Sequence, residues 1–479
     1  MRARSEAVQN RSACVIGAGP NGLAAAVVLA QAGLRVDVLE AQATPGGAAR
    51  TLELTLPGFR HDFGSAVHPL AIGSPFFSAL PLAEHGLQWI HSPVAVAHPL
   101  DDGSAVTVAR GIEHGADALG IDRAAWNHLI GDFATHWDAF APDVLHPLPF
   151  IPRDPLRMAR FGVLALQSAR SIARRFYSEQ TKALFAGMAA HSFLRLDEPL
   201  SAAFGLLMAI SACAVGWPIP RAGAASITAA LCGVLDSLGS SVRASKPVTH
   251  LADLAGYDVL LCDVTPRQLA EIGAAQFSKS YLRQLRQYRY GVGVFKVDYA
   301  LRCPIPWKAP ECSQAATVHI GGTFDEIAAS EAAVRGGQHA ERPFVLLAQP
   351  SLFDDSRAPA GQHTAWAYCH VPNGSTQSAL ASIENQIERF APGFRDCILA
   401  RHTLGPVDLE RMDANLVGGD ISGGAMDLHQ FLFRPTWRGY STSASNTYLC
   451  SASTPPGAGV HGMCGYHAAS KALANMKRT

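Results

Sequence analysis

A glycine-rich turn near the start of the sequence combines the residue types that bind a dinucleotide. Four apolar residues, Ala13–Ile16, lead into Gly17-Ala18-Gly19-Pro20-Asn21-Gly22, and an Ala-rich segment follows. Gly17 lets the chain reverse, Gly19 lets backbone approach a pyrophosphate, and Gly22 lets the next helix pack closely on the strand. The free N–H groups and the dipole of a helix N-terminus favour an anion there.

An acidic residue follows at the place where a ribose would lie. A second apolar run ends on Glu40, whose carboxylate can accept hydrogen bonds from an adenosine ribose and would repel the 2′-phosphate of NADP. A lone G-x-G-x-x-G motif is a weak signal, but here a strand precedes it, a helix follows it and the acid is in place. The sequence therefore predicts a strand, turn, helix and strand that bind a dinucleotide other than NADP.

A second glycine-rich segment distinguishes between cofactors. Gly46-Gly47-Ala48-Ala49-Arg50 comes shortly after Glu40, and an acid followed by Gly-Gly-x-x-Arg resembles the FAD fingerprint of the amine-oxidase and phytoene-desaturase superfamily. The resemblance implies a loop that closes over the FAD diphosphate, with Arg50 in a charge-assisted contact. An ordinary glycine-rich turn with a surface arginine is the alternative.

The C-terminal region carries a further strand, glycine loop and helix. Tyr448–Ser451 is expected to be a strand, 454–463 a loop, and Cys464–Met476 a helix. This resembles the C-terminal FAD segment of phytoene-desaturase-like oxidoreductases, where the helix N-terminus faces the flavin. Such a dipole stabilises negative charge on a reduced flavin.

Motifs spread along the chain resemble one branch of this superfamily, the proteins similar to pyridine nucleotide-disulfide oxidoreductase domain-containing protein 2. The motifs are GAGPNGLAAA, HDFGSAVHPL, VHIGGTFDEI, GGDISGGAMDLHQFLFRP and YLCSASTPPGAGVHGMCGYHAA. Three positions depart from expectation. Ala222 and Ala458 stand where we expect Gly, and Ser451-Ala452-Ser453 replaces the Gly-Asp of many relatives.

The resemblance implies a set of cofactor-binding residues, including Gly64 and Ser65 at the flavin ring and Val248 near the adenine. The full predicted set is Gly17, Gly19, Pro20, Asn21, Gly22, Glu40, Ala41, Gly46, Gly47, Arg50, Gly64, Ser65, Val248, Ser451, Gly459, Val460, His461, Gly462 and Met463. The implied reaction is hydride transfer from a hydrophobic compound, polyene-like or isoprenoid-like, to flavin N5.

Acid–base machinery is less evident than the cofactor signatures. Asp427 and His429 are two residues apart, hence on one face if the segment is extended, and are the candidates for proton transfer near the flavin. A structural role in holding the glycine-rich loop is an equal alternative. An amine oxidase and a flavin-bound scaffold protein also remain open, and no metal site is predicted.

The amino-acid composition limits the kinds of molecule that this protein is expected to bind. Hydrophobic residues make up 48% of the chain, charged residues 16%, and the formal net charge is zero. This argues against nucleic acid, which needs a basic face, and suits a hydrophobic small molecule or peripheral contact with a membrane. The ten cysteines show no C-x-x-C pair, and a short polar tail, Met1–Arg11, precedes the first strand. We expect a cytoplasmic protein without a secretion signal; the oligomeric state is not predicted.

The predicted fold is α/β, with a Rossmann-like FAD-binding domain assembled from discontinuous segments and an inserted α+β substrate domain. Residues 1–75, 221–275 and 405–479 are assigned to the FAD-binding domain, and 76–220 and 276–404 to the substrate domain. Residues 161–177 have an amphipathic helical pattern, and 200–217 suit a buried helix better than a bilayer span. Side chains that alternate in character along the sequence predict strands over Tyr288–Tyr299, Ala316–Ile320 and Phe344–Gln349. Because side chains alternate between the two faces of a strand, Trp366, Tyr368 and His370 are expected on one face of a further strand.

Overall fold

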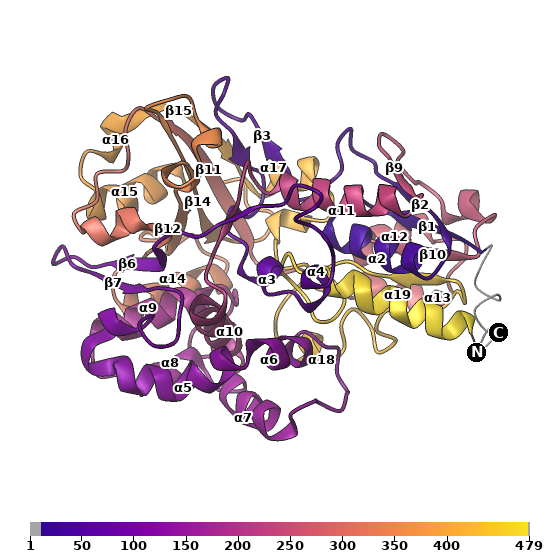
Figure 1. The fold of residues 1–479 in the computed structure, drawn as a ribbon, viewed down its shortest axis with the longest axis horizontal. Coiled ribbons are helices and arrows are strands. Elements are labelled where there is room, and N and C mark those ends of the chain that lie inside the picture. The colour runs from indigo at the N-terminus through magenta and orange to yellow at the C-terminus, as the bar shows by residue number, and fades with distance from the viewer. Residues whose placement is uncertain (1–10, 478–479) are drawn as a thin grey trace.

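Two β-sheets organise the molecule, which we describe from a computed structural model (Figure 1). The structure describes residues 11–477, so all but Arg11 of the predicted polar tail lies outside the described residues. The predicted α/β class is confirmed, because a parallel sheet with helices on both faces lies beside a larger mixed sheet with its own helical layers.

The smaller sheet is wholly parallel and draws its strands from distant parts of the chain. Its order is β16 (Thr447–Leu449), β10 (Val259–Cys262), β1 (Ser12–Ile16), β2 (Arg35–Leu39) and β9 (Ser241–Arg243). One face packs on α2 (Pro20–Gln31), α11 (Ala225–Ser237) and α19 (Met463–Met476). The other packs on α12 (Pro266–Ile272) and α13 (Lys279–Arg286). Burial on both faces explains why β1 and β10 are continuously apolar.

The larger sheet has seven strands. Its order is β15 (Ile398–Leu404), β11 (Gly293–Leu301), β14 (His363–Val371), β13 (Val345–Ala348), β12 (Ala315–Ile320), β6 (Val94–Pro99) and β7 (Ala105–Val108). All neighbours are antiparallel except β12 and β6. One face packs on α15 (Leu380–Phe390) and α16 (Phe394–Cys397).

Helices cover the opposite face of the larger sheet and form one large apolar core with it (Figure 1). They are α5 (Arg123–Thr135), α6 (Trp137–Val144), α7 (Pro155–Ala165), α8 (Ala169–Ala173), α9 (Glu179–Ala190), α10 (Ser201–Ala214) and α14 (Phe324–Arg335). Helix α10 is the buried helix expected within 200–217. Within residues 11–477, every helix is too short or too polar to cross a bilayer.

Short elements connect these layers. The short strands are β3 (Thr51–Leu52), β4 (His61–Asp62), β5 (Trp89–Ile90) and β8 (Ile219–Pro220), which pair as β3–β4 and β5–β8. The remaining helices are α3 (Pro69–Ile72), α4 (Pro75–Ser78), α17 (Pro406–Met412) and α18 (Leu428–Leu432). The 3₁₀ turns are η1 (Asp117–Asp122), η2 (Leu251–Leu254), η3 (Pro310–Gln314), η4 (Pro350–Leu352), η5 (Asp355–Arg357) and η6 (Val417–Gly419).

The structure corrects three sequence expectations. The amphipathic stretch 161–177 is not one helix, because Ser168 caps a separate helix, α8, by accepting a hydrogen bond from Ser171 N–H. Strand β11 begins at Gly293 rather than Tyr288. Helix α13 packs on the parallel sheet, although the predicted boundary at 275 assigns it to the other domain.

Candidate active site

A large cavity opens where the carboxyl ends of the parallel strands face the mixed sheet. Its empty volume, part of which is open to solvent, is about 1180 Å³, and open α/β sheets commonly bind ligands at this edge. Its walls come from the first glycine turn, the second glycine loop, the ends of β4 and β10, strands β11 and β14, and the C-terminal glycine loop. We call it the cofactor cavity.

The first glycine turn has the tight geometry predicted for it. Gly17 has a φ of +96°, a region that favours glycine, and its N–H donates to the Leu39 carbonyl. A Cβ on Gly19 would lie 2.8 Å from Asp263 Oδ2, and one on Gly22 would lie 2.1 Å from the Gly17 carbonyl oxygen. Only glycine fits at Gly19 and Gly22 without displacement of these neighbours.

Glu40 and Arg50 hold the glycine loops in place. Glu40 Oε2 accepts a hydrogen bond from Ala18 N–H, and Glu40 Oε1 accepts one from Gln42 N–H, both at 2.8 Å. Arg50 donates to the carbonyls of Gly47 and Met412, at 2.7 and 2.9 Å. Both charged side chains are buried, so each is anchored to the backbone beside the cavity.

The C-terminal glycine loop reaches the same cavity, and His461 terminates it. His461 Nδ1 accepts a hydrogen bond from Met463 N–H at the start of α19. Burial lowers the pKa of His461 to about 4, so the imidazole is neutral at physiological pH. Helix α19 crosses α2 so closely that a Cβ on Gly465 would meet the Asn21 carbonyl oxygen at 1.8 Å.

Two acids line the cavity beside the glycine turns: Asp263, which is buried, and Asp413, which is half-buried. Asp263 Oδ2 accepts a hydrogen bond from Gly22 N–H at 2.8 Å, and burial raises the pKa of Asp263 to about 7. Burial also raises the pKa of Asp413, which lines the same cavity. Both carboxyl groups therefore hold a proton more readily than exposed aspartates do.

The wall from the mixed sheet contributes a lysine that sequence reasoning missed. Lys296 on β11 lines the cavity, is buried, and forms an ion pair with Asp298 on the same strand. Burial lowers the pKa of Lys296 and raises the pKa of Asp298. A detectable signal was present in the sequence: a lysine and an aspartate two residues apart within an otherwise apolar strand.

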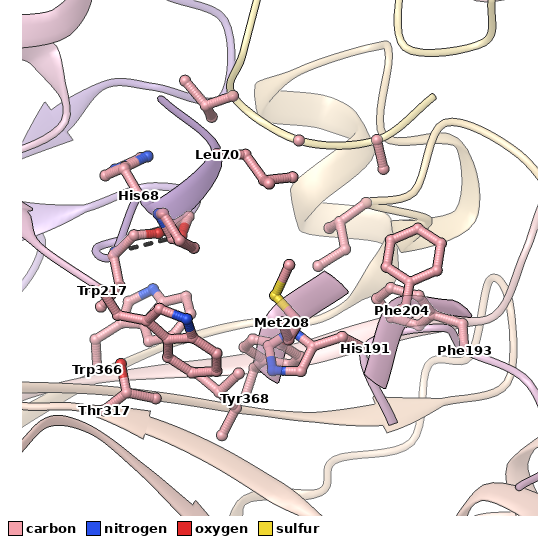
Figure 2. Close-up of a pocket in the computed structure, with 18 residues that line it drawn as sticks. His68, Leu70, His191, Phe193, Phe204, Met208, Trp217, Thr317, Trp366 and Tyr368 are labelled. Atoms are coloured by element: carbon pink, nitrogen blue, oxygen red, sulfur yellow. Dashed lines mark hydrogen bonds between the residues drawn. The ribbon is translucent and has the colours of Figure 1, made fainter. Parts of the chain in front are cut away.

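A second, apolar cavity adjoins the first. Its empty volume, part of which is open to solvent, is about 920 Å³. Figure 2 shows Trp217, Thr317 and Trp366 gathered at one end and Phe193 and Phe204 at the other. None of its described lining residues is an aspartate, glutamate, lysine or arginine. It has the lining expected of a site for a hydrophobic molecule.

Both cavities share one wall. Six residues line the two of them: Ser65, Trp366, Tyr368, Ile421, Gly459 and Val460. The indole of Trp366 and the phenol of Tyr368 lie edge to face, with ring centroids 5.2 Å apart. The predicted strand face is confirmed for these two aromatics, while His370 on the same face pairs with Glu331.

The structure divides the predicted cofactor residues into two groups. Those that line the cofactor cavity are Gly19, Pro20, Asn21, Gly47, Gly64, Ser65, Ser451, Gly459 and Val460. Those that do not are Gly17, Gly22, Glu40, Ala41, Gly46, Arg50, Val248, His461, Gly462 and Met463. Several of the second group shape the loops from behind, as described for Gly22, Glu40 and Arg50. Among residues 11–477, no group of side chains is arranged to hold a metal ion.

Asp427 and His429 do not meet at either cavity. The extended conformation behind that prediction is wrong, because Asp427 caps helix α18 by accepting a hydrogen bond from Gln430 N–H. Asp427 also pairs with Arg289, and His429 is exposed beside Phe433. These contacts identify a helix cap and a surface side chain.

Comparison with known proteins agrees with this geometry. Residues 15–77 match the model of the NAD(P)-binding Rossmann-like domain. The chain is 25% identical to the mouse protein "Pyridine nucleotide-disulfide oxidoreductase domain-containing protein 2", over 97% of this chain and 94% of the relative. It is 24% identical to phytoene dehydrogenase of Streptomyces griseus, over 85% of this chain and 80% of that protein.

Solved structures share the fold at low sequence identity. An oxidoreductase from Methanosarcina mazei superposes with a TM-score of 0.65 at 17% identity, covering 96% of this chain and all of that one. Putrescine oxidase bound to putrescine superposes with a TM-score of 0.61 at 15% identity, covering 98% of this chain and 99% of that one. The resemblance stated from the sequence and the predicted fold class are confirmed, and the relatives are oxidoreductases.

Proposed function

We propose that this chain is an FAD-dependent oxidoreductase related to the phytoene desaturases and amine oxidases, and that it dehydrogenates a hydrophobic small molecule. FAD in the cofactor cavity would supply a hydride acceptor, which is chemistry that no side chain of this protein can perform. The specific proposal concerns the substrate: an apolar compound, polyene-like or isoprenoid-like, held in the second cavity.

The residues of the cofactor cavity fit FAD. Its glycines stand where a side chain would fill the space for a pyrophosphate. A Cβ on Gly47 would lie 3.3 Å from Gly19 Cα. Two stretches of backbone without side chains therefore face each other, as pyrophosphate binding requires. The buried amide oxygen Asn21 Oδ1, beside the same cavity wall, has no hydrogen-bond partner among the described residues. An extended ligand with several hydroxyl and amide groups would satisfy such positions.

The shared wall of the two cavities is the observation that carries this proposal. Because Ser65, Tyr368 and Gly459 line both, a group bound in the first cavity can lie against a molecule bound in the second without solvent between them. Hydride transfer needs this direct contact of reacting atoms and exclusion of water.

Side chains of this protein would orient the substrate rather than react with it. Trp217 and Trp366 offer flat apolar surfaces, and His191 adds a neutral imidazole, since burial lowers its pKa to about 3. Burial likewise lowers the pKa of His68 to about 4. The cavity is therefore uncharged at neutral pH, which favours an uncharged substrate.

The test is anaerobic bleaching of protein-bound FAD by a panel of isoprenoid, polyene and amine compounds. Bleaching by apolar compounds alone supports the proposal. The absence of bleaching by any compound, with FAD bound in stoichiometric amount, favours a scaffold whose role is interaction. Protein that cannot bind FAD would contradict the cofactor assignment itself.

An amine oxidase is the second candidate, favoured by the fold shared with putrescine oxidase and by the perpendicular Trp366 and Tyr368 rings. Aromatic faces can hold a cationic amine. Against it, the described lining of the second cavity contains no carboxylate to pair with an ammonium group. Bleaching by amines but not by hydrocarbons would select this candidate.

Domain limits and location are also proposals. We assign residues 1–75, 221–275 and 405–479 to FAD binding and the intervening segments to the substrate, with α13 added to the first set. We propose a cytoplasmic location, since all ten cysteines are free thiols, as is typical of a reducing compartment. Contact with a membrane surface would bring an apolar substrate to the second cavity.

A further inference from the structure

A buried charged pair lies directly behind the wall of the cofactor cavity. Lys296 and Asp298 are two residues apart on β11, so both side chains extend from the same face of the strand. Lys296 reaches the cavity, and its ammonium group pairs with Asp298 Oδ2. Asp298 is completely buried, and its other oxygen, Oδ1, has no hydrogen-bond partner among the described residues.

Strand β4 places a histidine opposite that free oxygen. His61 Nδ1 lies 3.6 Å from Asp298 Oδ1, and both side chains are almost wholly buried. This is within about 1 Å of an ordinary hydrogen bond, so a small movement of either side chain joins them. The other ring nitrogen, His61 Nε2, is 2.8 Å from Thr55 Oγ1.

Thr55 connects this buried cluster with the surface. It is half-buried within a loop whose neighbours Glu53, Leu56 and Pro57 are exposed. Its hydroxyl group can accept a hydrogen bond from the histidine and donate one to water. The four side chains thus lead from the cavity wall to solvent: Lys296, Asp298, His61 and Thr55.

Burial and nearby positive charges keep His61 neutral. The pKa of His61 is lowered to about 3, mainly by burial and further by Lys296, Arg357 and His402. Asp298 is the acid that faces it. A neutral imidazole has one N–H donor and one free acceptor nitrogen. It can therefore accept a proton on one nitrogen while releasing another from the opposite one.

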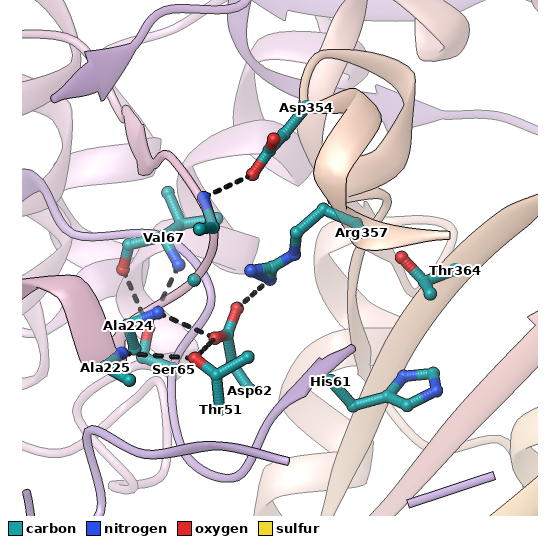
Figure 3. Close-up of polar contacts among 12 residues, drawn as sticks. Thr51, His61, Asp62, Ser65, Val67, Ala224, Ala225, Asp354, Arg357 and Thr364 are labelled. Atoms are coloured by element: carbon teal, nitrogen blue, oxygen red, sulfur yellow. Dashed lines mark hydrogen bonds and ion pairs between the residues drawn. The ribbon is translucent and has the colours of Figure 1, made fainter. Parts of the chain in front are cut away.

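Asp62, the next residue on β4, is a buried acid whose contacts are purely structural, and it serves as a comparison for Asp298. Asp62 Oδ1 accepts hydrogen bonds from Thr51 and from Ala224 N–H, and its other oxygen pairs with Arg357. Figure 3 shows this closed set of contacts, with His61 pointing away from it. Both Asp62 oxygens are satisfied, whereas Asp298 Oδ1 is left open toward His61.

We propose that Lys296, Asp298, His61 and Thr55 form a proton path between the cofactor cavity and solvent. The inference rests on the proposed function, because the path has a use only if FAD is bound in that cavity. His61 and Thr55 line neither of the two cavities, so they act through Lys296 and Asp298.

The proton balance of dehydrogenation gives the path its task. A substrate that loses two hydrogens passes a hydride to FAD and leaves one proton behind. When an electron acceptor then takes two electrons from reduced FAD, the proton on the flavin must also leave. In each case Lys296 passes a proton to Asp298, Asp298 passes one to His61 Nδ1, and His61 releases the proton on Nε2 to Thr55 and water.

The experiment measures proton release directly, without a substrate. The FAD of the holoprotein is first photoreduced anaerobically. The protein is then mixed in a stopped-flow instrument with ferricyanide, and each ferricyanide ion takes one electron. Two ferricyanide ions oxidise one reduced FAD, and one proton appears if the reduced flavin is anionic, or two if it is neutral. A pH-indicator dye reports the protons while absorbance reports the flavin. In the unmodified protein we expect proton release to keep pace with flavin oxidation.

Two independent variants break the path. With His61→Phe or Thr55→Val, we expect proton release to be delayed about tenfold or more relative to flavin oxidation. Thr55→Ser retains the hydroxyl group and should restore the release rate. His98→Gln is the matched control, because His98 is also buried but, among the described residues, its one hydrogen bond is to the Gly322 carbonyl; proton release in this variant should be unchanged.

Each outcome has one meaning. Release that stays synchronous in both His61→Phe and Thr55→Val, with FAD bound, overturns the proton path and leaves the proposed function intact. Equal delays in Thr55→Val and Thr55→Ser, or a delay in His98→Gln, also overturn it, because general loosening would then explain the effect. Failure of the unmodified protein to bind FAD contradicts the proposed function instead.

Discussion

The carboxylate of Asp263 accepts a hydrogen bond from the backbone N–H of Gly22, with 2.8 Å between Asp263 Oδ2 and Gly22 N. Gly22 belongs to the first turn of α2, where a bound diphosphate is expected. An acid in this position interacts with the same positive helix end as the cofactor. Its protonation state therefore affects both the stability of the cofactor-free protein and the charge of the site.

Asp263→Asn should stabilise the cofactor-free protein in a pH-dependent manner. The folded-state pKa of Asp263, about 7, is raised above its ordinary value of 3.8 by burial. The folded protein therefore binds more protons than the unfolded chain between these two values, and stability falls as pH rises through that window. Asparagine keeps an acceptor for Gly22 N–H without the charge.

The measurement is urea unfolding of the two cofactor-free proteins across this range. We expect the advantage of the asparagine variant to grow by about 1–3 kcal/mol between about pH 5 and pH 8. A constant difference at all pH values would show that Asp263 is not the titrating group.

Gly19→Val should prevent FAD binding. A Cβ at this position would lie 2.8 Å from Asp263 Oδ2, and the larger side chain would also occupy the cavity wall. The measurement is flavin absorbance per protein after purification. Gly256→Ala is the control, because a Cβ there has no neighbour within 4 Å. Full flavin content in Gly19→Val would contradict the assignment of the turn.

Lys296→Met should strongly destabilise the fold, because it leaves Asp298 buried without its partner. Removal of one member of a buried pair costs about 3–5 kcal/mol. The double variant Lys296→Met/Asp298→Leu should recover much of that loss, since no unpaired charge remains. Denaturant unfolding of both variants checks this; a double variant that is as unstable as the single one would indicate a packing defect.

Asp427→Asn and His429→Gln should leave flavin reduction within about twofold of the unmodified rate, in contrast to the loss expected for general acid–base groups. Asp427→Ala should lower the free energy of unfolding by about 1 kcal/mol, because it removes the cap of α18. Single-turnover flavin reduction and thermal unfolding measure these effects. A large loss of rate in His429→Gln would return this residue to the catalytic machinery.

NADH and NADPH should not reduce the flavin rapidly. The sequence contains one complete glycine-turn nucleotide motif, and FAD is proposed to occupy it. Stopped-flow mixing of each nucleotide with oxidised holoprotein is the measurement, with photoreduction as the positive control. Reduction within milliseconds would reveal another nucleotide site.

Local patterns in the sequence were sufficient for the nucleotide-binding half of the fold. Each element there is indicated by its own local pattern: the apolar run Ala13–Ile16, the glycine turn Gly17–Gly22 and the apolar run before Glu40. The structure has strand β1, the start of helix α2 and strand β2 at these places. The C-terminal loop and α19 follow for the same reason. Ala222, where glycine was expected, keeps the left-handed conformation with a φ of +64°.

Tertiary contacts account for what the sequence did not predict. Asp298, the partner of Lys296, lies next to His61 only because the fold brings β11 and β4 together, and no local spacing indicates that contact. Asp263 reaches Gly22 from 241 positions along the chain. The extended segment predicted around Asp427 is wrong, because helix capping competes effectively for a short acidic side chain, and Asp427 caps α18.

The discontinuous parallel sheet has a consequence for the order of events during synthesis. Strand β16 (Thr447–Leu449) joins the parallel sheet by pairing with β10, and Ser451 and Gly459 of the following loop complete the cofactor cavity. A nascent chain in which β1, α2 and β2 have emerged from the ribosome still lacks this wall while several hundred further residues are translated. FAD uptake must therefore await nearly the whole polypeptide, and the early ribosome-bound segments depend on later ones, or on chaperones, to cover their apolar faces.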